Sequence, residues 1–110
     1  MQQYRLEEKY NSYVQTNLFY LYSNNYKFEI GNQRALKLFY TALVLYKRGI
    51  VNNDKNPFFK ISYNLNYLYI YSRPKDKSIG FPKEILDNII EMLENKLNPT
   101  TNSSLNVNLA

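Results

Sequence analysis

The sequence contains no cysteine, no histidine and no tryptophan. The lack of cysteine excludes disulfide bonds, a thiolate nucleophile and the thiolate zinc sites of small domains. The lack of histidine removes the commonest metal ligand and the side chain that most often acts as a general base near neutral pH. With only three glycines, the chain also has no Gly-rich phosphate loop. These absences favour a binding protein over an enzyme, and we expect no cofactor and no metal ion.

The length of 110 residues is that of one small domain with a single hydrophobic core. We assign residues 1–98 to this domain. Residues 99–110 are rich in Asn, Ser and Thr, which is typical of a flexible polar tail. No internal repeat is apparent along the chain.

The net charge and the amino-acid composition give indications of the kind of partner and of the source genome. Fourteen basic residues against nine acidic ones give a net charge of +5, which favours a polyanionic partner but also promotes solubility. Asparagine, lysine, tyrosine, isoleucine and phenylalanine, all encoded by A/T-rich codons, supply 52 of the 110 residues. This bias indicates an AT-rich genome, such as that of a virus, a plasmid, an organelle or a low-GC bacterium.

The hydropathy pattern indicates a protein that does not enter a membrane. The longest apolar stretch, residues 38–46, is far shorter than the roughly 20 residues that a membrane-spanning helix requires. Residues 1–10 contain two glutamates and no apolar run, which argues against a secretory signal. We therefore expect an intracellular location, in the cytoplasm or an organelle matrix.

Hydrophobic periodicity predicts three helices. Residues 5–22 place apolar side chains at three- and four-residue steps. Residues 33–48 are apolar almost all round, which is typical of a central buried helix, and Gly49 supplies its end. A third helix, from Pro82 to about residue 97, repeats isoleucine and leucine every four residues. The charged segment 73–80 before it is predicted to be a loop.

Alternating residues predict three strands. Residues 26–30 alternate strictly, as in a half-buried strand. Residues 58–72 are apolar or aromatic at every odd position, and their central asparagines can form a turn. We favour a hairpin with strands 58–63 and 67–72, with one long strand as the alternative. The predicted order is thus α-β-α-β-β-α, an α+β fold with one small three-stranded sheet packed against helices. If the strand at 26–30 lies next to the following strand, the two should be parallel and joined by a right-handed crossover.

One aromatic and basic segment is a candidate nucleic-acid site. Tyr67, Tyr69 and Tyr71 share one strand face, where their rings can stack on unpaired bases. Basic residues in the following loop, in the next helix and at the end of the preceding one can neutralise phosphates. These candidate phosphate contacts are Arg73, Lys75, Lys77, Lys83, Lys47 and Arg48.

The stacking hypothesis depends on which face of this strand covers the core. If Leu68 and Ile70 cover it, the three tyrosines are exposed, whereas a buried tyrosine face would exclude stacking. We therefore predict a small, basic, non-enzymatic protein that binds RNA, DNA or a nucleoprotein assembly. The alternative is a protein-binding accessory or inhibitor that acts through a Tyr-rich interface, as a viral or plasmid effector or a subunit of an organelle complex. The predicted helix at residues 5–22 offers a possible homodimer face.

Overall fold

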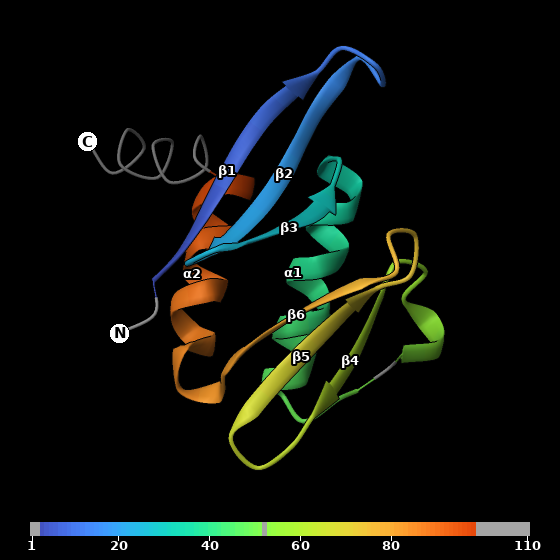
Figure 1. The fold of residues 1–110 in the computed structure, drawn as a ribbon. Coiled ribbons are helices and arrows are strands. Elements are labelled where there is room, and N and C mark those ends of the chain that lie inside the picture. The colour runs from blue at the N-terminus through green and yellow to red at the C-terminus, as the bar shows by residue number, and fades with distance from the viewer. Residues whose placement is uncertain (1–2, 52, 99–110) are drawn as a thin grey trace, which may run out of the picture.

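The computed structural model describes residues 3–51 and 53–98, which form two antiparallel three-stranded sheets and two helices (Figure 1). Sheet 1 and its helix contain β1 (Tyr4–Asn11), β2 (Thr16–Ser23), β3 (Tyr26–Gly31) and α1 (Gln33–Lys47). Sheet 2 and its helix contain β4 (Phe59–Tyr63), β5 (Tyr67–Ser72), β6 (Lys77–Pro82) and α2 (Leu86–Leu97). Two short 3₁₀ turns, at Asn53–Lys55 and Lys83–Ile85, precede β4 and α2.

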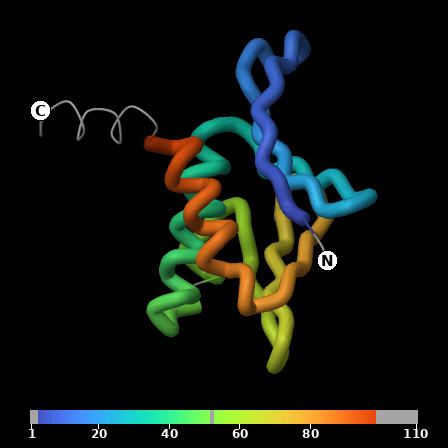
Figure 2. The backbone as a smooth tube through the Cα atoms, turned by 90° about the vertical axis from the view of Figure 1, so that its left-hand side faces the viewer, coloured from blue at the N-terminus to red at the C-terminus, as the bar shows by residue number. Residues whose placement is uncertain are grey.

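The two sheets lie on one side of the molecule and the two helices lie on the other. This arrangement is clearest when Figure 2 is compared with Figure 1, because the strands and the helices separate in the turned view. Helix α1 packs against strands of both sheets, whereas α2 packs against α1 and β1. Each sheet therefore has one face toward the helices and one face away from them, which we call its open face.

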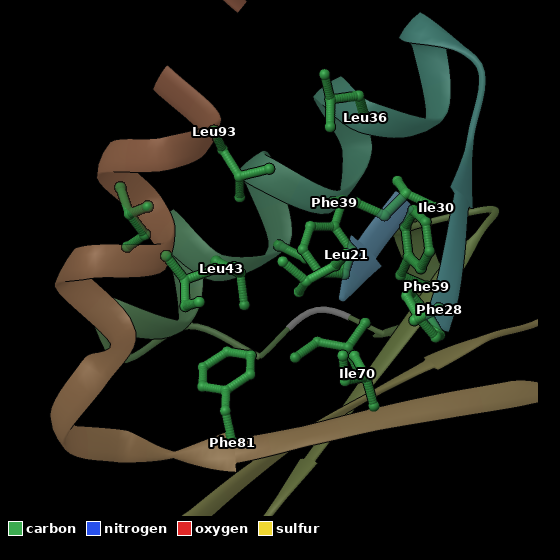
Figure 3. Packing of buried hydrophobic residues seen from close by; sticks show 14 of the residues in the cluster. Leu21, Phe28, Ile30, Leu36, Phe39, Leu43, Phe59, Ile70, Phe81 and Leu93 are labelled. Carbon is green, nitrogen blue, oxygen red and sulfur yellow. The ribbon is translucent and has the colours of Figure 1, made fainter. Parts of the chain in front are cut away.

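A single hydrophobic core lies between the two layers (Figure 3). At its centre, the ring of Phe39 on α1 lies 6.1 Å from the ring of Phe28 and 5.2 Å from that of Phe59, centroid to centroid. Phe28 belongs to sheet 1 and Phe59 belongs to sheet 2. The side chain of Phe39 thus joins the two sheets, and all three rings are almost fully buried.

The predicted order α-β-α-β-β-α with one three-stranded sheet is wrong, because the observed order is β-β-β-α-β-β-β-α with two sheets. The first error concerns residues 5–22, which form the β1–β2 hairpin instead of a helix. Asn11 ends β1, since its Oδ1 accepts hydrogen bonds from the backbone N–H groups of Tyr13 and Val14. Gln15, at φ 56°, completes the turn. The helical homodimer face predicted for this segment does not exist.

The second error concerns residues 73–82, for which the sequence pattern predicts a loop and a helix start but which contain the strand β6. Its buried Ile79 and Phe81 alternate with exposed or half-buried neighbours, as in a strand that covers a core on one side. Pro82 is the last residue of β6, and α2 begins four residues later. The predicted strand at 26–30 and the favoured hairpin within 58–72 are present, but they lie in different sheets, so no parallel pair joins them.

An internal repeat, missed in the sequence, relates the central strands of the two sheets. Asn17–Ser23 reads NLFYLYS and Asn66–Ser72 reads NYLYIYS. The two segments also have the same neighbours in register: Leu21 pairs with Leu6 and Phe28, as Ile70 pairs with Ile61 and Ile79. The open face of each sheet therefore carries tyrosines at equivalent positions of its central strand.

The predicted flexible tail, residues 99–110, lies outside the described residues. Over residues 3–51 and 53–98, neither helix is long and apolar enough to cross a membrane.

Candidate nucleic-acid interface

The tyrosines of β5 lie on the open face of sheet 2. Leu68 and Ile70 are completely buried and cover the core. Tyr67 and Tyr69 point the other way and keep 40% and 38% of their surface exposed, while Tyr71 is half-buried. The arrangement that would exclude base stacking, with the three rings facing the core, is thus not the one that the chain adopts.

The rings of this open face are held in place by one another and by hydrogen bonds. Tyr67 and Tyr69 are stacked, with ring centroids 6.1 Å apart and planes inclined by 18°. The Asn64 side-chain amide donates to the Tyr69 hydroxyl at 3.4 Å, and the Tyr71 hydroxyl donates to Oδ1 of Asp76 at 2.8 Å. The hydrogen bond to Asp76 and, to a smaller extent, burial raise the pKa of Tyr71. Each of the three rings thus has at least one contact within the fold that favours its orientation.

Small residues flank the rings on both neighbouring strands. Tyr69 pairs with Ser62 of β4 on one side and with Gly80 of β6 on the other. A Cβ atom at Gly80 would lie only 2.7 Å from Cδ1 of Tyr69, so the ring occupies the space that the missing side chain leaves. Tyr71 pairs with Lys60, an exposed cation on the same face that was not among the predicted site residues.

The cations of the β5–β6 turn point away from the stacked rings. Arg73 donates from Nη2 to the backbone carbonyl of Asn53 at 2.7 Å. Lys75 forms an ion pair with Glu29 of β3, with Nζ and Oε2 2.9 Å apart. Lys77 lies with Lys75 on the wall of a hollow of about 260 Å³ between the β5–β6 turn and sheet 1. These three predicted phosphate contacts therefore do not lie beside the stacked pair of β5.

The remaining predicted cations lie at two different places. Lys83 lines a hollow of about 420 Å³ together with Tyr67, so it stands at one end of the stacked pair. Its Nζ also lies 5.0 Å from the centre of the Tyr63 ring. Lys47 is paired with Asp87 of α2 at 2.7 Å, and Arg48 follows at the end of α1. Lys47 and Arg48 thus belong to the helix layer and do not extend the tyrosine face.

The open face of sheet 1 is a second aromatic and basic surface that was not predicted. Tyr20 and Tyr22 occupy the positions that correspond to Tyr69 and Tyr71 in the internal repeat. Cations of the neighbouring strands lie over both rings. The signal was present in the alternating residues 17–23, but the helical interpretation of 5–22 concealed it.

Both layers of the molecule carry a net positive charge. The two open faces and the hollow between them carry six cations, against carboxylates only at Glu7, Glu29 and Asp76; the cations are Arg5, Lys9, Lys27, Lys60, Lys75 and Lys77. The segment 33–48, which contains α1, carries four cations and no carboxylate, and the segment 83–97, which contains α2, carries four carboxylates and two lysines. The helix layer therefore has a net charge of +2 against +3 on the strand side, so net charge by itself does not distinguish the two sides for an anionic ligand.

Comparison with protein-family models, with curated proteins and with solved structures finds no match for this chain. Among the described residues, no three acidic side chains are grouped so that they could hold a metal ion. What the described part of the chain offers is a flat aromatic surface with cations at its margins, which is suited to stacking and to phosphate contacts.

Proposed function

We propose that this protein binds single-stranded RNA or DNA on the open face of sheet 2, alone or as part of a nucleoprotein assembly inside the cell. The observation that carries the proposal is the stacked, exposed pair Tyr67 and Tyr69 on a sheet face that neither α1 nor α2 covers. Aromatic rings displayed on a sheet stack on bases whose faces are free, which favours a single strand over a duplex.

Two lysines flank this aromatic surface and supply phosphate contacts. Lys83 shares a hollow with Tyr67 at one end, and Lys60 stands next to Tyr71 at the other. A strand that crosses β5 from Tyr67 to Tyr71 would thus meet a cation at each end. Since Lys60 and Lys83 would contact the phosphates of the nucleic-acid backbone, their contribution to the binding affinity should fall with rising salt and should be independent of base sequence.

The test is a fluorescence-anisotropy titration with labelled single strands of RNA and DNA and with the corresponding duplexes. Replacing Tyr69 by Ala should weaken single-strand binding about 5- to 150-fold, the value expected for one stacked base. Tyr69→Phe keeps the ring and should retain most of the affinity. Tyr13→Ala, which removes a ring that is 97% exposed at the hairpin tip, is the control and should have no effect. Equal affinities of Tyr69→Ala and the unmodified protein would refute stacking.

A second candidate function is supported by the tip of the β1–β2 hairpin, which extends beyond the rest of the fold (Figure 1). Tyr13 is 97% exposed there, and Tyr10 and Val14 are 66% and 58% exposed. Exposed aromatic and aliphatic side chains on a projecting hairpin suit an accessory protein that docks into a protein partner. In that case Tyr13→Ala, and not Tyr69→Ala, should abolish binding, and salt should have little effect.

A further inference from the structure

The two open faces are related by the internal repeat but present different chemical groups. On sheet 1, Cζ of Arg5 lies 4.4 Å from the centre of the Tyr22 ring, and Nζ of Lys27 lies 4.6 Å from that of Tyr20. Nζ of Lys9 also donates to the Tyr22 hydroxyl at 3.2 Å. Each of these tyrosine rings is thus already in contact with a cation through a cation–π interaction.

On sheet 2, the tyrosine rings of β5 have no such cover. Tyr67 and Tyr69 stack on each other, and among the described residues no cation lies over them. The exposed ring surface of sheet 2 is therefore available to bases. On sheet 1, Glu7 accepts from Nε of Arg5 at 2.7 Å and lies 3.8 Å from Nζ of Lys9, whereas Lys27 has no ion pair among the described residues. The N–H donors above these rings, those of Lys27 above all, match phosphate oxygens better than base faces.

The hollow between the sheets continues the cationic surface. Lys27 of β3 and the two lysines Lys75 and Lys77 of sheet 2 line it, together with Tyr20 and Glu29. Glu29 neutralises one of the three lysines through its ion pair with Lys75. Two of the three lysine charges therefore have no carboxylate partner among the residues that line this hollow of about 260 Å³.

From these observations we infer that the open face of sheet 1, with the hollow, is a phosphate-binding subsite for the backbone of a single strand. The inference rests on the proposed function, because the strand is the one whose bases stack on Tyr67 and Tyr69. The strands of both sheets lie on the side of the molecule away from the helices (Figures 1 and 2), and residues of both sheets line the hollow, so we place one nucleic-acid strand across the two sheets. The two copies of the repeat would thus bind different parts of the nucleic acid, the bases on sheet 2 and the phosphates on sheet 1.

The subsite is tested with an abasic oligonucleotide, a sugar–phosphate chain that has no bases to stack. At low salt, we expect it to bind the unmodified protein. The double variant Lys27→Gln with Lys77→Gln should weaken this binding by at least about tenfold and reduce the slope of log K against log salt by about 1.4, or about 0.7 for each phosphate that is no longer neutralised. Its matched control is Lys37→Gln with Lys55→Gln, which removes the same charge from exposed lysines of α1 and the 3₁₀ turn before β4.

The outcomes separate this inference from the proposed function. If the abasic chain does not bind, or if the control pair weakens it as much as the Lys27 and Lys77 pair does, the subsite is refuted, even where a normal strand still binds through Tyr69. If the abasic chain binds through Lys27 and Lys77 but a normal strand binds no more tightly, the subsite stands and base stacking is refuted. Circular dichroism of each variant verifies that the fold is retained.

Discussion

The ring of Tyr69 lies across Gly80, its partner on the neighbouring strand, and fills the space where any other residue would place a Cβ atom. An alanine at residue 80 would put that atom 2.7–2.8 Å from Cδ1 and Cε1 of the ring. Because Tyr69 is partly exposed, its ring can swing away, and we expect Gly80→Ala to retain the fold within about 1 kcal/mol of the original stability. The displaced ring should lose most of its contribution to single-strand binding.

Anisotropy titration and urea unfolding of Gly80→Ala test this relationship together. Ser78→Ala is the matched control, since residue 78 lies on the same strand and the same face, opposite Tyr71. The control should bind like the unmodified protein. If Gly80→Ala also binds normally, the orientation of the Tyr69 ring is not important for the ligand.

Phe39 should be essential for the stability of the whole chain, because its ring joins the cores of both sheets. Truncating a buried phenylalanine to alanine costs about 3–5 kcal/mol, a large part of the stability of a small domain. We expect Phe39→Ala to lower the urea concentration at the unfolding midpoint strongly, with both sheets unfolding together in one cooperative transition. Leu65→Ala, at a residue that is 86% exposed, should change stability by less than about 0.5 kcal/mol. Two separate transitions in Phe39→Ala would contradict a shared core.

Asn53 protects the outer edge of sheet 2. Its side-chain amide donates to the backbone carbonyl of Ile61 at 3.0 Å, and its Oδ1 accepts from the Ile61 N–H at 2.7 Å. Asn53→Ala should therefore leave both polar groups of this edge residue unpaired, at a cost of about 1–3 kcal/mol in chemical denaturation. Asn88→Ala, on the exposed side of α2, should be neutral or slightly stabilising because alanine has the higher helix propensity. Equal effects of the two substitutions would exclude this role.

The hydrogen bond from the Tyr40 hydroxyl to Oε2 of Glu94, 2.8 Å long, ties α1 to α2 and should make their packing depend on pH. This bond, followed by burial, raises the pKa of Tyr40 in the folded state. A group whose pKa is raised by folding stabilises the fold below its unfolded pKa, about 10 for tyrosine, and loses that effect as pH rises through the folded value. Tyr40→Phe should thus be less stable than the original by less than about 1 kcal/mol at neutral pH.

Above about pH 10, the difference between Tyr40→Phe and the unmodified protein should decrease. Urea unfolding of both proteins at neutral and alkaline pH measures it. Tyr13→Phe, at the exposed hairpin tip, controls for general effects of tyrosine ionisation and should match the unmodified protein throughout. A difference for Tyr40→Phe that stays constant with pH would show that the hydrogen bond to Glu94 does not contribute.

The elements that could be predicted from the sequence were those in which apolar residues recur with one clear spacing, either that of a helix or that of a strand. Residues 33–48 are bounded by an asparagine whose Oδ1 accepts from the Ala35 N–H and by a glycine with positive φ, so their local signals agreed with the tertiary structure. In residues 5–22, apolar residues happened to fall at helical steps on both strands of a hairpin. The asparagine turn at Asn11 was not recognised, and the period of two in β2 was therefore overlooked.

The candidate site was predictable only in part. The alternation of β5 placed the tyrosines on one face and Leu68 and Ile70 on the other, but only packing against the helices decides which face, if either, is exposed. The strand β6 was not predicted because Gly80 and Pro82 are rare inside strands, although in the fold the Tyr69 ring occupies the space beside Gly80. The direction of the turn lysines toward sheet 1 depends on contacts between residues far apart in the sequence, such as Lys75 with Glu29.

Binding on the open sheet faces can be observed residue by residue in a titration of the isotope-labelled protein with a short single strand at low salt, followed through its backbone amide NMR signals. We predict that the signals of β5 and β6 shift most, that those of β2 and β3 shift next, and that α1 and α2 change little. No shifts, or shifts confined to the helices or to the tip of the β1–β2 hairpin, would show that the open sheet faces do not bind nucleic acid.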